Sequence, residues 1–329
     1  MFILNAHEPN ELAQYLKQKK WLSANEIILS LTKPGEGNMN YVLRVTTDLR
    51  TFIIKQSRAY VEKYPQIAAP ENRVVTEAAF YKKIASEETV QKRMPELLGL
   101  DTDNNVLLLE DLGSSNDYSV LYNLNRGLLK FEILILISYL NDLHRLFKKV
   151  QLDNELTNLP LRKLNYEHIF NYPFLEENGF DLNTIQEGLQ ELALLYKKDI
   201  TLKKQVELLG SSYMSKGNYL VHGDYYPGSW LNTEDGIKII DPEFCFYGIR
   251  EFDIGVFIAH LYLSKQKQEI IDSIVEYYDH YNELNSSILN QFIGVEIMRR
   301  LIGLAQLPLK MKLEDKNELL QFAYKLIVK

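Results

Sequence analysis

The amino-acid sequence predicts an α+β protein with a small β-rich lobe followed by a larger, mainly helical lobe. Short runs rich in β-branched and aromatic residues dominate the sequence up to Leu109. Turn-forming residues then gather at Leu109–Asn116. Beyond that segment, apolar residues recur at helical spacing, interrupted by one pair of strands. We therefore expect two lobes, one over 1–112 and the other over 113–329.

The N-terminal lobe is predicted to open with a helix over Pro9–Lys19, because Leu12, Tyr15 and Leu16 have helical spacing. A second helix is expected over Pro70–Ala85. The predicted strands of this lobe are Ile27–Thr32, Tyr41–Thr46, Thr51–Gln56, Pro95–Leu100 and Val106–Leu109.

The C-terminal lobe is predicted to be mainly helical, with two strands carrying its chemical motifs. The expected helices are Leu128–Lys149, Asp181–Tyr213, Ile249–Leu263, Gln268–Leu284, Ile288–Ala305 and Asp315–Leu326.

Composition excludes several classes of function. The chain has 329 residues, and 37 basic against 44 acidic side chains give a net charge of −7 (37 − 44), without a basic footprint for nucleic acid. The most apolar run, Leu128–Leu143, carries charges and is too short to span a bilayer. With a single cysteine, Cys245, and no predicted signal peptide, we expect a cytoplasmic protein with no membrane partner. A homodimer is kept as an expectation.

The segment Leu220–Trp230 has the residues of a catalytic loop. An apolar entry leads into His222-Gly223-Asp224, and Ser229 follows Asp224 at a distance of five residues. In phosphoryl transfer a carboxylate orients the attacking hydroxyl, and a polar side chain five positions later binds metal in kinase loops. Asp224 is therefore a candidate base and Ser229 a candidate magnesium ligand, although Ser229 alone could equally cap the following turn.

Asp241 and Glu243 follow an apolar strand predicted over Ile237–Ile240. Residues at i and i+2 of a strand share a face, so both carboxylates could reach one Mg²⁺. A solvated acidic turn is the alternative. The flanking apolar sequence favours the metal site, because buried carboxylates without a cation are costly.

Three further segments are candidates for nucleotide binding. Lys55 ends a strand, and Glu77 on the following helix is its expected ion-pair partner, with Arg58 and Lys63 as competitors for a phosphate. The loop carrying Gly35, Gly37 and Asn38 has glycines that allow backbone amides to approach phosphates. Backbone groups of Glu110 and Leu112, in the connector between the lobes, could hydrogen-bond an adenine edge.

The adjacent arginines Arg299 and Arg300 lie in an apolar predicted helix. Their side chains point about 100° apart on a helix, so at most one faces a given site. An arginine in apolar surroundings suggests an anionic partner, such as a phosphate or a charge that develops in a transition state. A salt bridge to Glu296 or Glu314 is an equal alternative on spacing alone.

Together these residues resemble the aminoglycoside phosphotransferase and choline kinase group of protein-kinase-like enzymes, and most closely the methylthioribose kinases. The resemblance rests on Gly37-Asn38-Met39-Asn40, Lys55-Gln56 with Tyr60-Val61, Glu110–Leu112, His222–Asp224 with Gly228-Ser229, Asp241–Gly248 and Arg299-Arg300. The segment Tyr225–Pro227 departs from the family pattern.

The resemblance implies a bilobal protein-kinase-like fold, with a nucleotide-binding lobe over 1–112 and a catalytic, substrate-binding lobe over 113–329. It also implies Asp224 as base, Asp241 and Glu243 as Mg²⁺ ligands, Lys55 on the phosphates of ATP, and Arg299 or Arg300 on the transferring group or the sugar. The expected reaction is transfer of the γ-phosphoryl group to a hydroxyl of 5-methylthioribose or a related sugar. The alternatives are a kinase for an amino alcohol, a hydroxy amino acid or an aminoglycoside, a non-catalytic nucleotide-binding module, or a metal-dependent hydrolase.

Overall fold

The computed structural model describes residues 2–35, 39–113, 115–123, 126–152, 155–278 and 284–329. By their internal contacts the residues fall into two compact units. Unit 1 comprises Met1–Ser115 with Lys238–Phe244, and unit 2 comprises Asn116–Ile237 with Cys245–Lys329. The predicted boundary at residue 112 lies close to this division. Lys238–Phe244, however, belongs to unit 1, whereas the sequence placed it in the C-terminal lobe.

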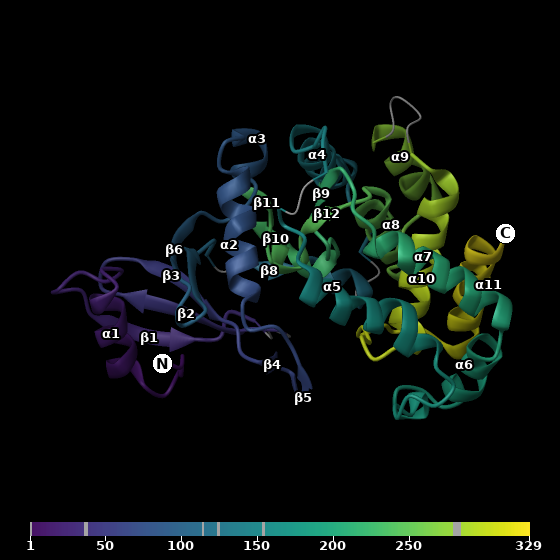
Figure 1. Ribbon diagram of the computed structural model, residues 1–329, viewed down its shortest axis with the longest axis horizontal. Helices are drawn as coiled ribbons and strands as arrows, with labels where there is room; N and C mark the ends of the chain where they lie inside the picture. Colours follow the sequence, from purple (N-terminus) through teal and green to yellow (C-terminus); the bar gives the residue numbers. More distant parts are fainter. Residues whose placement is uncertain (1, 36–38, 114, 124–125, 153–154, 279–283) are drawn as a thin grey trace. The chain divides into compact units, whose positions relative to one another are not determined.

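Within the described residues of unit 1, five strands form an antiparallel sheet in the order β1-β2-β3-β7-β6 (Figure 1). Their bounds are β1 Ile28–Thr32, β2 Tyr41–Thr47, β3 Thr51–Gln56, β6 Leu97–Asp101 and β7 Val106–Glu110. The unit also contains α1 Pro9–Gln18, α2 Arg73–Ile84, α3 Glu88–Gln91 and the short hairpin β4 Tyr60–Val61 with β5 Tyr64–Ala68. The sequence analysis did not predict this hairpin.

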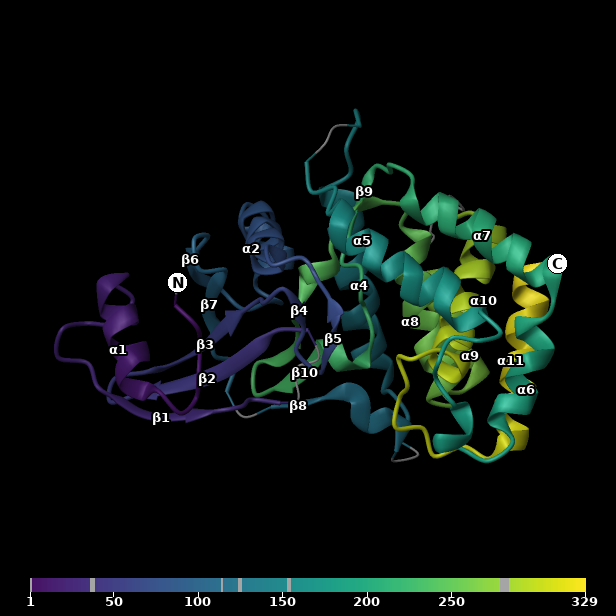
Figure 2. The same ribbon diagram turned by 60° about the horizontal axis from the view of Figure 1, so that its bottom comes forward.

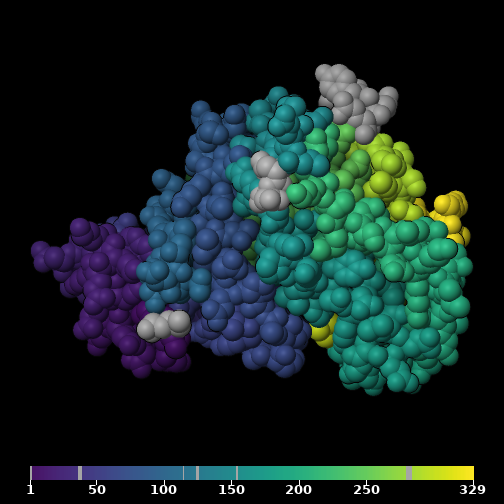
Figure 3. Space-filling view, in the orientation of Figure 1, coloured from purple at the N-terminus to yellow at the C-terminus, as the bar shows by residue number. Residues whose placement is uncertain are grey.

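The alternation of side chains along β3 gives the sheet two different faces. Phe52 and Ile54 point to one face and join Leu12 and Leu16 of α1 in a buried core. Lys55, the next residue, points to the opposite face, where it reaches Glu77 of α2. The helix α1 lies at the surface of unit 1, in purple in Figure 3.

Unit 2 is mainly helical, as predicted from the sequence. Its helices are α4 Lys130–Leu146, α5 Leu159–Tyr166, α6 Leu189–Lys197, α7 Ile200–Met214, α8 Glu251–Leu263, α9 Gln268–Tyr278, α10 Ser286–Ile302 and α11 Leu313–Val328. α10 packs against both α8 and α11 (Figures 1 and 2), and nearly all residues in its second half are buried. The single helix predicted over Asp181–Tyr213 is wrong. Asp199 begins a new helix there, because its side chain accepts a hydrogen bond from the Leu202 amide at 2.8 Å.

Two short strand pairs in unit 2 carry the motif segments. β9 Tyr219–Val221 pairs antiparallel with β12 Phe246–Gly248, and β10 Trp230–Thr233 pairs with β8 Asn116–Asp117. The strand β11, Gly236–Ile239, contains the point at which the chain passes into unit 1. β9 leads directly into the predicted catalytic loop, so the β9–β12 pair fixes the start of that loop.

The β9–β12 pair requires glycine at position 217. A Cβ atom on Gly217 would lie 2.0 Å from the carbonyl oxygen of Gly248, so an alanine forces the backbone apart. We expect Gly217→Ala to lower the free energy of unfolding by about 1–3 kcal/mol, as overpacking does in other cores. Denaturant unfolding of the purified variant measures this change. Gly127→Ala is the matched control, because the nearest atom to its Cβ, Gln266 Oε1, is 3.9 Å away. Equal losses in the two variants would contradict the packing argument.

Candidate active site

Unit 1 brings together a lysine and two carboxylates from separate segments. Lys55 Nζ on β3 donates to Glu77 Oε1 on α2 at 2.8 Å and also to Asp241 Oδ1. The Lys55 and Glu77 side chains are buried, whereas 44% of the Asp241 side chain is exposed. The predicted Lys55–Glu77 ion pair is therefore present in the structure, and Asp241 shares the same ammonium group.

The charges of this cluster support one another. Burial acts to lower the pKa of Lys55, but Asp241 and Glu77 outweigh burial and raise that pKa above its usual value. Lys55 is thus held as a cation. Burial raises the pKa of Glu77, against the opposing effect of Lys55. Arg58 and Lys63, the alternatives to Lys55 for phosphate contact, have other partners. Arg58 pairs with Glu62, and the Lys63 ammonium lies over the Tyr64 ring.

The sequence suggested that Asp241 and Glu243 share one face of a strand. In the structure neither residue lies on a strand. Asp241 has a φ of 62°, in the left-handed region, and Glu243 lies in the 3₁₀ turn η6 Pro242–Phe244. The turn directs the two carboxylates to different partners. Asp241 reaches Lys55, whereas Glu243 Oε2 accepts from Asn40 Nδ2 at 3.0 Å. Strained backbone of this kind clusters at functional sites.

Glu243 belongs to a buried network with Arg73, the first residue of α2. Arg73 Nε lies 3.5 Å from Glu243 Oε2 and 3.2 Å from Asn40 Oδ1. Burial, and then the nearby Glu77, raise the pKa of Glu243 to about 8, although Arg73 opposes the change. Glu243 thereby ties the loop before β2 to α2. The sequence analysis did not identify Asn40 or Arg73 as members of the site.

Some oxygen atoms of this region are suitable ligands for a hard cation such as Mg²⁺. Carboxylate oxygens are the ligands that Mg²⁺ prefers, and Asp241 offers an exposed carboxylate. In the described part of the chain no group of three or more His, Cys, Asp or Glu side chains is arranged to hold a metal ion. Asp241 thus has a carboxylate open to a cation, whereas Glu243, two positions later, is engaged by Arg73.

The remaining nucleotide-binding candidates of unit 1 are only partly placed. Gly37 and Asn38 lie outside the described residues. Apart from its chain neighbours, no atom of the described residues lies within 4 Å of the ideal Cβ position of Gly35. The Glu110 amide donates to the Glu96 carbonyl at 2.9 Å, so this amide is used in the sheet rather than presented to a ligand. Leu112 follows Asp111, which pairs with Arg44 at 2.8 Å and so anchors the connector.

Unit 2 holds the predicted catalytic loop through a residue that the sequence analysis missed. Asp253, in the first turn of α8, is fully buried and accepts hydrogen bonds from the amides of His222 and Gly223 at 2.7 and 2.9 Å. Gly223 has a φ of 87°, which glycine adopts without strain. An acidic residue in a helix's first turn is common, so only the fold reveals this role.

Asp224 therefore lies in a loop held by hydrogen bonds, and its side chain is partly exposed. The Ser229 hydroxyl donates to the Asp224 carbonyl oxygen at 2.8 Å, and the Ser229 amide donates to the Tyr226 carbonyl. Both contacts close the loop. The metal role of Ser229 stays a prediction, and the structure gives this residue a loop-closing one.

Arg299 and Arg300 lie near the end of α10 and share one carboxylate. Glu296 accepts from Arg299 Nη1 at 2.9 Å and from Arg300 Nε at 2.6 Å. Of the two predicted partners, Glu296 is thus the one that the structure shows. Arg300 Nη2 also lies 3.7 Å from Asp224 Oδ1. The structure therefore brings a predicted arginine to the predicted base within unit 2.

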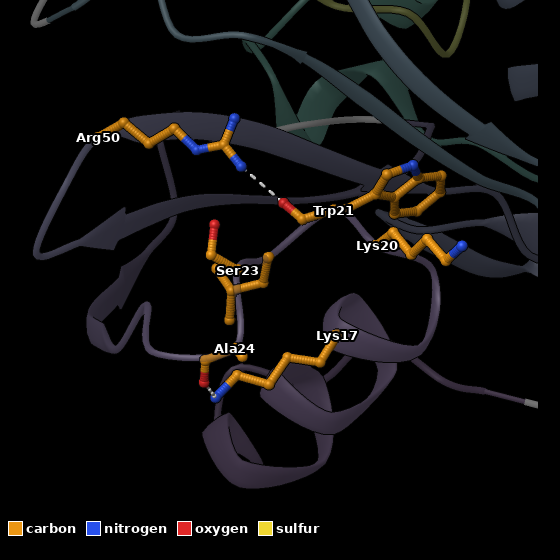
Figure 4. Close-up of a pocket in the computed structure, with 7 residues that line it drawn as sticks. Lys17, Lys20, Trp21, Ser23, Ala24 and Arg50 are labelled. Carbon is orange, nitrogen blue, oxygen red and sulfur yellow. Dashed lines mark hydrogen bonds between the residues drawn. The ribbon is translucent and has the colours of Figure 1, made fainter.

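A cavity of about 480 Å³ in unit 1 is lined by other residues (Figure 4). Its lining residues are Lys17, Lys20, Trp21, Leu22, Ser23, Ala24 and Arg50. Lys17 and Arg50 donate to the carbonyl oxygens of Ala24 and Trp21 at 2.7 and 2.6 Å. These contacts hold two of the basic side chains against the cavity wall. None of the site residues predicted from the sequence lines this cavity.

Comparison with known proteins decides the family. The model of the phosphotransferase enzyme family matches residues 30–285, which is most of the chain. The chain belongs to this family. It is a small-molecule phosphotransferase, and the resemblance found in the sequence is confirmed at this level. Among the described residues, no helix is both long and apolar enough to cross a membrane.

Individual relatives agree with this assignment. A methylthioribose kinase of Geobacillus sp. (strain WCH70) is 28% identical, over 89% of this chain and 82% of the relative. LicA, solved in complex with AMP, has a TM-score of 0.56 at 14% identity and covers 98% of this chain and 99% of its own. A spectinomycin phosphotransferase, solved with ADP and spectinomycin, has a TM-score of 0.52 at 14% identity, over 96% and 98% of the two chains. The predicted protein-kinase-like fold is confirmed.

We expect the buried His260 of α8 to make the stability of this phosphotransferase sensitive to acid. Burial is the main reason that the pKa of His260 falls to about 4; the Glu296 contact opposes the change and Arg300 reinforces it. An unfolded histidine has a pKa of about 6.5. Between these values the unfolded chain binds the proton and the folded chain does not, so stability falls as the pH drops below 6.5.

At pH 5.5 this effect is worth about 1 kcal/mol relative to pH 7.5. We expect His260→Asn to lose less stability than the wild type when the pH changes from 7.5 to 5.5, as measured by urea unfolding. His7→Asn, at an exposed histidine, should keep the wild-type pH dependence. An unchanged pH dependence in His260→Asn would show that His260 is not the group responsible.

Proposed function

We propose that this phosphotransferase moves the γ-phosphoryl group of ATP to a hydroxyl of 5-methylthioribose, with Mg²⁺ as cofactor. The observation that carries the proposal is the pairing, within unit 2, of Asp224 with Arg300 on a loop held by Asp253. The names of the relatives support the sugar as acceptor, since the methylthioribose kinases match nearly the whole chain.

Each residue has a defined task in this proposal. Lys55, kept cationic by Glu77 and Asp241, binds the ATP phosphates. Asp241 and Glu243 are the proposed ligands of Mg²⁺, which when bound neutralises phosphate charge. Gly35, Gly37 and Asn38 belong to the loop proposed to cover the phosphates, and Glu110 and Leu112 to the adenine connector.

The proposed chemical step begins at Asp224. Its carboxylate accepts the proton of the sugar hydroxyl, whose oxygen forms the new bond to the γ-phosphorus while the bond to the ADP oxygen breaks. The Arg300 guanidinium stabilises the negative charge on the transferring group. Arg299, which shares Glu296 with Arg300, supports the same positively charged region.

The charge beside Asp224 bears on the choice of acceptor. Arg299 and Arg300 with Glu296 carry one net positive charge, which offsets the negative charge of Asp224 and leaves no net attraction for a cationic amine. A neutral sugar needs no such attraction. Amino alcohols and aminoglycosides are therefore the competing acceptors to include in any assay.

The homodimer expected from the sequence stays a prediction.

An ADP-release assay across hydroxylated acceptors tests the acceptor and the base together. We expect methylthioribose to give the highest kcat/KM. Asp224→Asn should reduce kcat by about 10²–10⁴-fold, because the general base is lost, while the dissociation constant for ATP stays within about threefold. A higher kcat/KM for an amino alcohol would reject the sugar, and wild-type turnover in Asp224→Asn would remove Asp224 from the mechanism.

Calorimetric titration with ATP, in Mg²⁺ and in EDTA, tests Asp241. The wild type should bind ATP more tightly when Mg²⁺ is present, and Asp241→Asn should lose most of that difference, since an amide is a much weaker Mg²⁺ ligand than a carboxylate. Asparagine tolerates the left-handed backbone at this position, so the loop should be retained. If Mg²⁺ strengthens ATP binding equally in both proteins, Asp241 is not a ligand.

A further inference from the structure

Glu296 is a buried carboxylate with donors from two helices. Only 1% of its surface is exposed. Its Oε1 atom lies 2.6 Å from Arg300 Nε, 3.1 Å from Arg299 Nη1 and 3.0 Å from His260 Nε2. A buried carboxylate is costly unless it is paired and hydrogen-bonded, so these donors together make the charge tolerable.

The protonation states in this network follow from its contacts. Burial acts to raise the pKa of Glu296, but Arg299 and Arg300 outweigh burial and hold it well below its usual range. Glu296 can therefore only accept hydrogen bonds. His260 must then carry its proton on Nε2, which leaves Nδ1 to accept from the Tyr122 hydroxyl at 2.5 Å. The chain of donors runs in one direction, from Tyr122 through His260 to Glu296.

The shared carboxylate places the two arginines differently. Arg299 Nη1 donates to both oxygens of Glu296. Among the described residues, the buried Nε atom of Arg299 has no hydrogen-bond partner. Arg300 uses Nε instead. Its Nη2 atom lies 3.7 Å from Asp224 Oδ1, longer than a hydrogen bond, and its guanidinium lies over the Tyr226 ring at 4.9 Å. Arg300 is thus the arginine whose outer edge is turned to the base.

We propose that Glu296 is a positioning residue that selects Arg300, rather than Arg299, to contact the transferring phosphoryl group. It does so by holding Nε, so that the Nη edge of the guanidinium points to the Asp224 side. His260 and Tyr122 orient Glu296 in turn. This inference rests on the proposed function, because it concerns the same site and reaction.

A double-mutant cycle tests the inference on the full-length enzyme with its best acceptor. Glu296→Gln keeps the side chain's size but removes its charge, and Arg300→Lys keeps the charge but removes the planar fork. We expect each single variant to reduce kcat by about 100-fold, the cost of misplacing a group that stabilises the transition state. The double variant should be no more than about threefold worse than Arg300→Lys, since Glu296 acts through Arg300.

Glu132→Gln is the matched control. Glu132 is another buried glutamate of unit 2, and it pairs with Arg126 at 2.7 Å and with the Tyr118 hydroxyl at 2.8 Å. The substitution should lower the melting temperature, as Glu296→Gln does, but leave kcat within about threefold of the wild type. If Glu132→Gln loses as much kcat as Glu296→Gln, the loss is a general effect of stability and the inference is overturned.

Two further outcomes would also overturn it: a double variant in which the separate losses multiply, or wild-type kcat in Glu296→Gln. Turnover of an acceptor by the wild type tests the proposed function separately.

The hydrogen-bond network around Glu296 can be tested without a substrate. ¹⁵N NMR of the His260 ring measures which ring nitrogen carries the proton. We expect an Nε2-protonated neutral ring at pH 6; a ring protonated on Nδ1, or a cationic ring, would refute the arrangement even if the enzyme is active.

Discussion

The buried ammonium group of Lys55 is the interaction on which unit 1 depends. Removing a charge from water is costly unless opposite charges surround it, so the strand that carries Lys55 must pack against the segments that carry Glu77 and Asp241. These segments are far apart in the sequence. Their shared cation is one of the contacts that hold Lys238–Phe244 in unit 1, together with those of Glu243 to Asn40 and Arg73. The core formed with α1 on the other face of the sheet keeps β3 in place.

In unit 2 the organising buried charges are carboxylates, and they too are surrounded by partners, here cations and hydrogen-bond donors. Two buried carboxylates collect donors from separate segments: Asp253 holds the amides of His222 and Gly223, and Glu296 holds Arg299, Arg300 and His260. Buried polar groups are almost always satisfied by hydrogen bonds, and a satisfied network fixes a unique geometry. Asp253 and His260 both lie on α8, so this helix connects the loop that bears Asp224 with the helix that bears Arg300.

Local sequence patterns predicted much of this arrangement. The pairing of Lys55 with Glu77 was predicted from a strand end and the following helix, together with the C-terminal motifs that indicated a kinase. The alternatives for Arg300 included its actual partner, Glu296. Remote partners were beyond such patterns. Nothing near Glu243 in the sequence points to Asn40, which is 203 positions away. Asp253 looks like any acidic residue in a first helical turn, and only the structure shows that the Asp199 side chain caps a new helix.

We propose that this phosphotransferase builds a phosphate ester on a sugar hydroxyl. The most direct measurement is ³¹P NMR of the reaction mixture after incubation of the enzyme with ATP, Mg²⁺ and methylthioribose. We expect one new phosphomonoester resonance, coupled to the anomeric proton of the sugar, that grows as ADP forms. Inorganic phosphate as the only new phosphorus product besides ADP, with the sugar recovered unchanged, would contradict it.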